Sequence, residues 1–459
     1  MATTYLHKNQ ASPTNANKFT YSVWLKRSKL GVAQRFYQGY ESGNNRLYAM
    51  MSANDTIFCY GVTGGNVQVN IETTRKFRDT NGWYHVVIKG DSTDGTSTDR
   101  TQIWVNGVRE TVLTVSSNIN QNTAFGNLVA QSNNTLTISG TESHSELWDG
   151  SMSHIHFTDG YAYDASAFGQ TDSTTGEWSI NTSPSVTYGN TGYFVLKDGN
   201  SVTDSSDNSN DFSVGAGTLT KAEDCPDNVF ATLDNLGIEA GANGTTFSNG
   251  NTTYSSGGHS NVRFYVSNLG ATSGKFYCEI KPTSLSSHNL IGVATHGITS
   301  AMSNYYFGGS GSEAHTGDEF EWGYKAESGN IENNASSSSY GNTYAANDII
   351  GIAMDLDNSK LYFSKNGVFQ NSGAPTSGST GTGAISITAP ASTDTGFYHF
   401  AVAKATSSTD TATFQCNFGD GYFGTTAVAS AGTNASGIGI FEYDVPAGYT
   451  ALSTKGLNE

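Results

Sequence analysis

The stretch DIIGIAMDLDNSKLYFSKNGVFQ, residues 348–370, decides the fold of this chain. It contains two apolar-alternating runs around an Asn-Ser pair, and an Asn-Gly pair follows the second run. Alternating runs bounded by such turn residues predict antiparallel β-strands. The same plan occurs earlier, where WYHVVIKG (83–90) is followed by TQIWVNGVRE (101–110). Because Asn-Gly adopts positive φ at low cost, each pair predicts a tight turn and carries no chemistry by itself.

Composition predicts a folded, β-rich protein with more than one domain. The chain has 459 residues, and since all-β sandwiches reach about 200–250 residues, two large domains fit this length. Strand-like runs recur without crossover helices, so the sequence predicts an all-β fold of two tandem antiparallel β-sandwiches with a short C-terminal arm. The best helix candidate is short, at residues 164–170, with Asp164 as its N-cap.

The charge balance argues against several classes of partner. Only 23 Lys and Arg residues stand against 40 Asp and Glu residues, a net charge of −17, and phosphate binding needs clustered cations. We therefore expect no nucleic acid and no anionic membrane among the partners. The N-terminus shows no apolar signal region, and no stretch approaches ~18 uninterrupted apolar residues, so we expect cytoplasmic synthesis and no membrane insertion.

Three of the four cysteines have a structural interpretation. Cys278 in KFYCEIK and Cys416 in TFQCNFG share a strand face with apolar neighbours, and Cys59 shows a shorter version of this pattern. They are predicted to be buried small hydrophobic residues.

Shifts in local composition suggest the domain boundaries. A polar tract precedes KAEDCPDNVFATLDNL (221–236), and the tail after Gly419 is rich in Ala, Gly and Ser. We predict a first domain at 1–224, a second domain with its linker at 225–419 and an arm at 420–459. The side chains of the arm are too small for a third core, so the arm packs either on the second domain or on a neighbouring subunit.

Two domain families share these motifs. The strand IIGIAMDLD, its tight turn and the strand KLYFSKNGV, preceded by EWGYKAESG (321–329) and closed by TFQCNFG, resemble the core of a SPRY domain over residues 272–419. The runs FTYSVWLKRS, GWYHVVIKG and QIWVNGV resemble a laminin G-like, concanavalin A-type jelly roll. The SPRY resemblance implies that the strands of Cys278 and Cys416 lie side by side and that the two thiols approach each other.

A third resemblance concerns the origin of the chain. HFTDGYAYDASAFG (156–169), DNSNDFSV (207–214) and PDNVFATL (226–233) are similar to segments common in virion proteins of marine bacteriophages. This resemblance implies a location on the virion surface, other virion proteins as partners and a homo-oligomer, because symmetric assembly multiplies weak contacts into useful avidity.

Carboxylate pairs are the first candidates for catalysis. Laminarinase-type glucanases with this jelly roll carry an E-x-D-x-E strand, and this sequence has none. FEYDVPAG supplies only Glu442 and Asp444, and EFEW supplies Glu319 and Glu321, which we expect to face solvent. Since nucleophile and phosphate-loop signatures are also missing, we predict that the chain is not an enzyme and uses no cofactor.

Two groups of residues have spacing suited to metal ions. His154 and His156 share a predicted strand face with Asp159 close behind, and the loop GDSTDGTSTDRT (90–101) offers Asp91, Asp94 and Asp99 for Ca²⁺. The histidines are better explained by a solvated or interface face. Because the loop lacks regular ligand spacing, we predict no metal site, while Ca²⁺ at this loop stays the alternative.

Binding is the better-supported class of function. Carbohydrate recognition needs aromatic faces and neutral polar side chains, and both are plentiful here. Trp322 in EWGY matches a framework position of SPRY domains, so we place it in the core. Tyr305 and Tyr306, in SNYYFGGSGSE, cannot both point inward from a strand, and we predict that they form an exposed ligand-binding patch.

The sequence therefore predicts a non-enzymatic bacteriophage virion structural protein, in a tail fibre or tip or a surface fibre. It is expected to bind a host-surface glycan or another virion protein. The jelly roll is predicted to begin within about twenty residues of Met1, so we expect no fibre shaft ahead of it. A head-decorating or minor capsid protein is thus one alternative, and a glycoside hydrolase on a jelly-roll scaffold is another.

Overall fold

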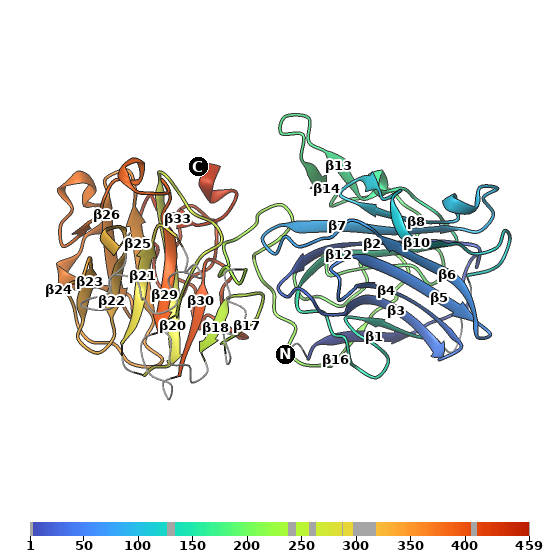
Figure 1. The fold of residues 1–459 in the computed structure, drawn as a ribbon, viewed down its shortest axis with the longest axis horizontal. Coiled ribbons are helices and arrows are strands. Elements are labelled where there is room, and N and C mark those ends of the chain that lie inside the picture. Colours follow the sequence, from blue (N-terminus) through green and yellow to red (C-terminus); the bar gives the residue numbers. More distant parts are fainter. Residues whose placement is uncertain are drawn as a thin grey trace. The chain divides into compact units, whose positions relative to one another are not determined.

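The computed structural model describes residues 3–125, 134–236, 245–256, 263–286, 288–296, 318–404 and 411–458. Strands dominate these residues (Figure 1), and the predicted all-β class is confirmed. The chain divides into two compact units, the first comprising Met1–Lys221 with Cys225–Asp227 and the second Ala222–Asp224 with Asn228–Glu459. No helix in the described ranges is long and apolar enough to span a bilayer.

The first unit contains two antiparallel sheets. The eight-stranded sheet has the order β10-β6-β5-β4-β3-β11-β1-β16, with bounds Leu113–Ser117, Asn66–Thr73, Ile57–Thr63, Asn45–Met51, Gln34–Ser42, Thr135–Ile138, Tyr5–Asn9 and Ser213–Ala216. The six-stranded sheet has the order β15-β12-β2-β7-β8-β9, with bounds Tyr193–Val195, Gly150–Asp159, Lys18–Arg27, Trp83–Asp91, Thr101–Val105 and Val108–Arg109. A small hairpin, β13 (Gly169–Thr171) and β14 (Trp178–Ile180), stands off these sheets (Figure 1).

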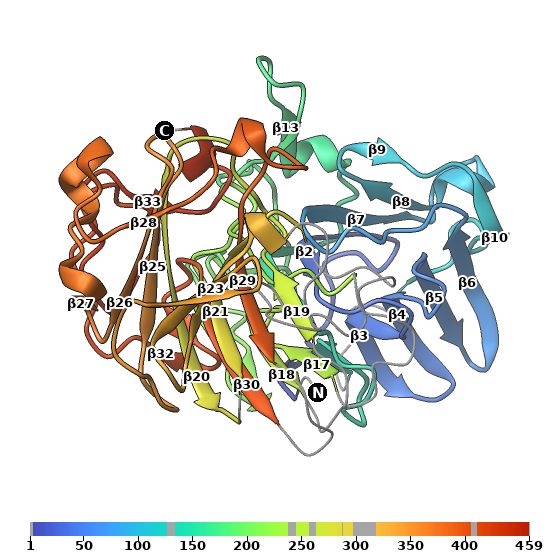
Figure 2. The ribbon, with the colours of Figure 1, turned by 60° about the vertical axis from the view of Figure 1, so that its left-hand side comes forward.

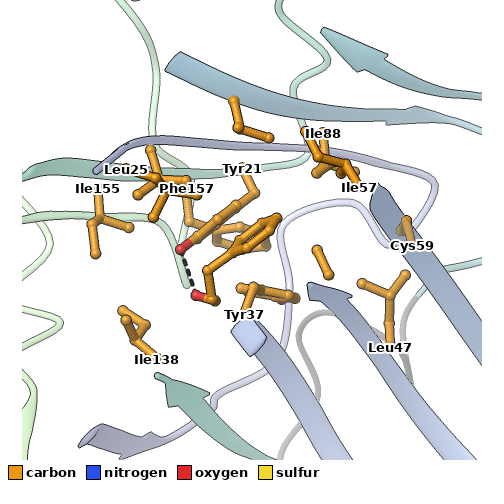
Figure 3. Close-up of a cluster of buried hydrophobic side chains, with 14 of the residues drawn as sticks. Tyr21, Leu25, Tyr37, Leu47, Ile57, Cys59, Ile88, Ile138, Ile155 and Phe157 are labelled. Atoms are coloured by element: carbon orange, nitrogen blue, oxygen red, sulfur yellow. Dashed lines mark hydrogen bonds between the residues drawn. The ribbon is translucent and has the colours of Figure 1, made fainter. Parts of the chain in front are cut away.

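The core of the first unit lies between the inward faces of these two sheets. Leu47 and Cys59 enter it from the eight-stranded sheet, and Val23 and Val86 enter it from the six-stranded sheet, all with at most 1% exposure. The core also holds tyrosines, and a buried hydroxyl needs a partner. The Tyr21 hydroxyl donates to the Phe36 carbonyl oxygen at 2.9 Å (Figure 3).

The second unit is also a two-sheet sandwich. Its larger sheet runs β17-β18-β30-β20-β25-β26-β27, with β28 beside β26 and β33 beside β20; the bounds are Thr245–Ser248, Thr253–Ser256, Ala412–Asn417, Lys275–Ser284, Ile350–Asp355, Lys360–Lys365, Val368–Phe369, Ile385–Ser386 and Thr450–Ala451. The other sheet runs β19-β29-β21-β22-β23-β24, with bounds Arg263–Val266, His399–Lys404, Asn289–Ala294, Trp322–Lys325, Asn330–Asn333 and Ser336–Ser339. A two-stranded sheet joins β31 (Tyr422–Phe423) and β32 (Thr426–Ala427).

The interpretation of the cysteines is confirmed. Cys59, Cys278 and Cys416 are fully buried free thiols, and burial raises the pKa of each one. Strands β20 and β30 pair as implied by the SPRY resemblance, with Ile280 opposite Cys416. Cys278 therefore lies diagonally across from Cys416 on the same face of the sheet.

The Asn-Gly pairs form the same kind of tight turn in both units. Asn106 and Gly107 have φ of 48° and 76°, and Asn366 and Gly367 have φ of 50° and 80°. Each asparagine also binds the preceding part of the chain through its side-chain oxygen. This oxygen accepts a hydrogen bond from the backbone N–H of His85 in the first unit and of Ile349 in the second, both at 2.8 Å. The backbone N–H of the asparagine donates back to the carbonyl oxygen of the same residue.

The expected helix at 164–170 is wrong in length and in its cap. Only Ala165–Ala167 is helical, as a 3₁₀ turn, η2. Asp164 stands at the N-cap position without a capping hydrogen bond, because its carboxylate instead pairs with Lys89 at 2.7 Å. The other described helices are also short 3₁₀ turns: Ser97–Asp99, Asp318–Phe320, Gln370–Ser372, Pro375–Thr380, Pro390–Ser392 and Gly456–Asn458.

The segment after Gly419 packs on its own unit, which is the first of the two arrangements left open above. Strand β33 pairs in parallel with β20, and Phe441, Val445 and Tyr449 are buried against the outward side of the larger sheet. The fully buried Glu279 of β20 accepts hydrogen bonds from the backbone N–H groups of Glu442 and Tyr443, at 2.7 and 2.8 Å. The segment is thus part of the second sandwich.

Candidate functional site

The outward face of the eight-stranded sheet carries a group of three aromatic rings outside the core. Strand alternation produces it, since side chains along a strand point to opposite faces. On β5, Ile57 and Cys59 point into the core and Phe58 and Tyr60 point outward, while Tyr48 points outward from β4. We call Tyr48, Phe58 and Tyr60 the aromatic face. Figure 2 shows the strands β3 to β6 that carry it and its polar neighbours side by side.

The register of the strands brings these rings together. Tyr48 lies directly opposite Tyr60, with ring centroids 5.5 Å apart. Phe58 lies 5.9 Å from Tyr60 and 6.0 Å from Tyr48, and all three side chains are half-buried. The row continues on both sides with amide side chains, as Asn70 is paired with Tyr60 and Gln38 is paired with Tyr48.

Arg35 lies at one end of the aromatic face and connects it to its polar neighbours. Its guanidinium group stacks on the Tyr48 ring, 3.9 Å from the centroid. Its Nε donates to Glu146 at 2.6 Å and its Nη1 donates to the Gln38 side-chain oxygen. Gln38 in turn donates to Glu142 at 2.6 Å. Because Arg35 covers Tyr48, the rings of Phe58 and Tyr60 are the ones left to contact a ligand.

The two glutamates come from a strained loop at the border of the face. His144 and Glu146 have φ of 59° and 52°, values that cost free energy in residues other than glycine. The Thr141 hydroxyl fixes the loop through contacts with the Ser143 and Ser145 hydroxyls at 3.0 and 2.9 Å. The loop therefore holds its carboxylates against the sheet in one arrangement.

This arrangement suits binding by stacking and hydrogen bonds. Burial raises the pKa of Tyr48, against the opposing effect of Arg35, so its hydroxyl stays protonated at neutral pH. Half-buried rings flanked by amide and carboxylate groups offer one apolar surface with donors and acceptors at its edge. Such a surface complements the apolar face and the hydroxyls of a sugar ring.

The predicted carboxylate pairs are not brought together as catalytic groups. Glu319 lies exposed in a 3₁₀ turn and Glu321 is fully buried, so the expectation that both face solvent from one strand is wrong. A turn precedes β22 here, and it breaks the alternation. Glu442 accepts the backbone N–H of Ala429, and Asp444 accepts that of Thr433, so both carboxylates fix turns.

The histidine group is built differently from the prediction. A bulge at Ser153–His156 interrupts β12, and His154 has φ of 47°. His156 is 2% exposed, stacks on Phe194 at 3.9 Å and contacts the Tyr188 hydroxyl at 3.0 Å. The expectation of a solvated or interface face is therefore wrong for His156. The buried Asp159 carboxylate accepts the backbone N–H of Thr14 at 2.6 Å.

The aspartates of the loop 90–101 hold that loop together. Asp91 pairs with Lys18 at 2.8 Å, and Asp94 accepts the backbone N–H of Thr96 at 2.8 Å. Asp99 pairs with Arg109. Over the described ranges of the chain, no group of three or more His, Cys, Asp or Glu side chains is arranged to hold a metal ion.

A buried serine–histidine contact also lacks the features of a nucleophile and its base. Trp178 donates its indole N–H to Nδ1 of His85 at 2.9 Å. Burial lowers the pKa of His85 to about 3, so the ring is neutral and carries its proton on Nε2, which lies 2.8 Å from the Ser22 hydroxyl. In this tautomer Nε2 donates a proton and cannot accept one from Ser22.

The remaining sequence predictions concern aromatic residues. Trp322 is 5% exposed and packs in the core, as predicted. Tyr305 and Tyr306 lie outside the described residues, so the structure gives no account of them. Sequence reasoning missed the aromatic face, although β5 held a signal for it. Once Ile57 and Cys59 are assigned to the core, Phe58 and Tyr60 must share the opposite face.

Comparison with known families agrees with this architecture. Residues 2–166 match the laminin G-type model of the concanavalin A-like lectin/glucanases superfamily, and residues 275–389 match the SPRY domain. No curated protein matches the chain in sequence.

Three solved structures are similar to parts of the chain. The SPRY domain of human HERC1 is 15% identical, with a TM-score of 0.29 over 40% of this chain and 96% of that chain. The stonustoxin structure is 14% identical, with a TM-score of 0.28 over 41% and 27% of the two chains. A heptameric SAP-like pentraxin from Limulus polyphemus is 14% identical, with a TM-score of 0.26 over 34% and 69%. From the two family matches, the chain carries a laminin G-like, concanavalin A-like domain followed by a SPRY domain.

Proposed function

We propose that this chain is a non-enzymatic structural protein of a bacteriophage virion that binds a host-surface glycan through the aromatic face. The observation that carries the binding part is the cluster of Tyr48, Phe58 and Tyr60, whose centroids lie within 6.0 Å of one another on adjacent strands. Two rigid strands hold the rings, so a ligand does not have to order them.

A sugar fits this surface better than a nucleotide. The carbon–hydrogen face of a pyranose stacks on an aromatic ring, and its hydroxyls need mixed donors and acceptors. Asn70 and the Tyr60 hydroxyl lie beside the rings, and the positive charge of Arg35 is compensated by Glu146. The net charge of −17 disfavours polyanions such as nucleic acids.

The virion part rests on sequence resemblance. The segments 156–169, 207–214 and 226–233 are similar to those of marine phage virion proteins. A tail fibre, fibre tip or surface fibre that forms a homo-oligomer and contacts other virion proteins would display the aromatic face in several copies, which strengthens weak binding. A head-decorating or minor capsid protein is the alternative location.

Immunogold electron microscopy of intact particles tests the location. We expect an antibody against residues 272–419 to label the tail end. Label spread over the capsid would replace the tail assignment with decoration, and an unlabelled particle would contradict the virion assignment.

Binding to purified host polysaccharide tests the function. We expect Tyr60→Ala and Phe58→Ala each to weaken binding by about 5- to 30-fold, since a stacked ring contributes about 1–2 kcal/mol. Val112→Ala, which changes a 69% exposed side chain beside β10 of the same sheet, is the matched control. Unchanged binding in both aromatic variants would contradict the assignment. Release of reducing ends from the polysaccharide would favour the glycoside hydrolase instead.

A further inference from the structure

A second aromatic surface lies on the other sheet of the first unit. It comes from the segment that follows β12, within the motif HFTDGYAYDASAFG. Tyr161 is 37% exposed, and its ring lies nearly parallel to that of Tyr163, with an interplanar angle of 17° and centroids 6.1 Å apart. One face of Tyr161 is therefore stacked against Tyr163.

The pair is held rigidly although it lies at the surface. The buried Thr20 hydroxyl donates to the Tyr161 carbonyl oxygen at 3.1 Å and accepts the Tyr163 N–H at 2.7 Å. The buried Thr158 hydroxyl donates to the same carbonyl oxygen at 2.9 Å. The Tyr163 hydroxyl accepts the backbone N–H of Thr187 at 3.0 Å. The Tyr161 ring therefore leaves a fixed backbone position and rests on an anchored Tyr163 ring, which lowers the entropic cost of binding.

Polar groups lie beside the pair. Asp164 follows Tyr163 in the chain and pairs with Lys89 at 2.7 Å, while 52% of its side chain stays exposed. The carboxylate therefore keeps oxygen lone pairs that can accept hydrogen bonds, and Lys89 supplies a donor.

The size of the exposed surface decides between a protein partner and a sugar. Among the described residues of segment 160–192, Tyr161 is the one large apolar side chain that is exposed, while Ala165 and Phe168 are buried. A stable protein interface buries about 800 Å² on each partner, far more than one ring offers. A single pyranose ring matches it in size.

We propose that Tyr161, supported by Tyr163 and flanked by Asp164 and Lys89, is a second saccharide-binding site that takes an uncharged pyranose. Thr20 and Thr158 point away from the core of the six-stranded sheet, because their neighbours Phe19, Tyr21 and Phe157 point into it. The site therefore lies on the side of the sandwich opposite the aromatic face. One molecule can then bind two glycan segments. Binding at Tyr161 does not require binding at the aromatic face.

Saturation-transfer difference NMR with the uncharged hexasaccharides cellohexaose, mannohexaose and xylohexaose tests this inference on the full chain. If the two sites bind independently and with similar affinity, Tyr161→Ala should remove about half of the ligand signal, and the Tyr161→Ala/Tyr60→Ala double variant should remove nearly all of it. Tyr161→Phe keeps the ring and should keep the signal. Phe397→Ala, which removes a 46% exposed aromatic side chain in the second unit, is the matched control.

The outcomes separate this inference from the proposed function. A signal lost in Tyr60→Ala and unchanged in Tyr161→Ala would overturn the second site and leave the aromatic face intact. A signal unchanged in Tyr60→Ala and lost in Tyr161→Ala would support the second site and count against the aromatic face. No signal from the wild-type chain with any of the three hexasaccharides would overturn the second site.

Discussion

At the scale of single residues, Lys8 is the least expected feature of the first unit. It follows Leu6 on the same face of β1, so it points toward the core. Its Nζ lies 5.6 and 5.8 Å from the ring centroids of Phe212 and Tyr193. Burial lowers the pKa of Lys8 to about 8, against the opposing effects of Asp204 and Asp211. The folded chain therefore holds a partly desolvated cation.

We predict that Lys8→Met stabilises the first unit by about 1–2 kcal/mol at pH 7, after allowance for solvent screening. Between pH 8 and 10.5 the unfolded chain binds this proton more often than the folded chain does, so wild-type stability rises with pH and the advantage of the variant shrinks. Urea unfolding at pH 7 and pH 10 measures both effects. A variant less stable than the wild type at pH 7 would show that the Lys8 cation is stabilising.

At the scale of elements, the two Asn-Gly turns can be predicted from the sequence, and each turn also packs against an aromatic side chain. The residue after each asparagine lies under an aromatic ring. A Cβ at Gly107 would come within 2.4 Å of Trp178, and one at Gly367 within 2.6 Å of Tyr443. The turns could be predicted from the Asn-Gly pairs alone. The ring that covers each glycine could not, because Trp178 and Tyr443 are more than 70 residues further along the chain.

We predict that Gly367→Ala destabilises the second unit by more than Gly448→Ala does. Both positions have positive φ, 80° and 85°, but a Cβ at Gly448 meets no atom within 4 Å. Both variants carry a backbone penalty of about 1 kcal/mol, and only Gly367→Ala adds a clash with Tyr443. Equal shifts in the urea midpoint would show that the ring moves aside at no cost.

The segment after Gly419 is the second feature at this scale. It covers Tyr277 and Tyr362 with Phe441, Val445 and Tyr449, all buried. We predict that truncation after Gly419 destabilises the second unit by more than about 4 kcal/mol, because each of these three side chains contributes about 1.5–3 kcal/mol by burial. Chemical denaturation of the truncated chain checks this. An unchanged midpoint would mean that the segment is a detachable attachment element.

At the scale of the whole molecule, the two units should respond to acid differently. In the first unit, burial lowers the pKa of His85 to about 3 and of His154 to about 4. Below pH 6.5 these histidines bind protons in the unfolded chain but not in the folded unit, so the first unit loses stability as pH falls. In the second unit, burial raises the pKa of Glu279 to about 7. Between pH 7 and 4.5 the folded unit binds the extra proton, so this group adds stability as pH falls.

We predict that calorimetry resolves two unfolding transitions. Between pH 7 and pH 5, the melting temperature of the first unit should fall further than that of the second. His399, whose pKa is lowered by burial, offsets part of the Glu279 effect in the second unit. In Glu279→Gln, the melting temperature of the second unit should therefore fall more steeply as the pH is lowered than it does in the wild type. Parallel shifts of both transitions in both proteins would contradict this account.

Much of the architecture could be predicted from sequence, and less of the site. The all-β class and the buried cysteines follow from alternation and turn residues, while the order of the two domain types and the Trp322 framework position follow from the resemblance to known families. The pairing of Tyr48 with Tyr60, the Arg35 network and the burial of His156 depend on register and a bulge. Local patterns do not determine these features.

The most direct measurement of the central claim is the affinity of the Phe58→Ala/Tyr60→Ala double variant for host-surface polysaccharide by surface plasmon resonance, beside the wild type and Val112→Ala. If the aromatic face binds glycan, the double variant should lose about 30-fold or more in affinity, from about 2 kcal/mol or more of lost stacking, while its melting behaviour and that of Val112→Ala stay unchanged. A folded double variant that binds the polysaccharide as tightly as the wild type would contradict the assignment of glycan binding to this face.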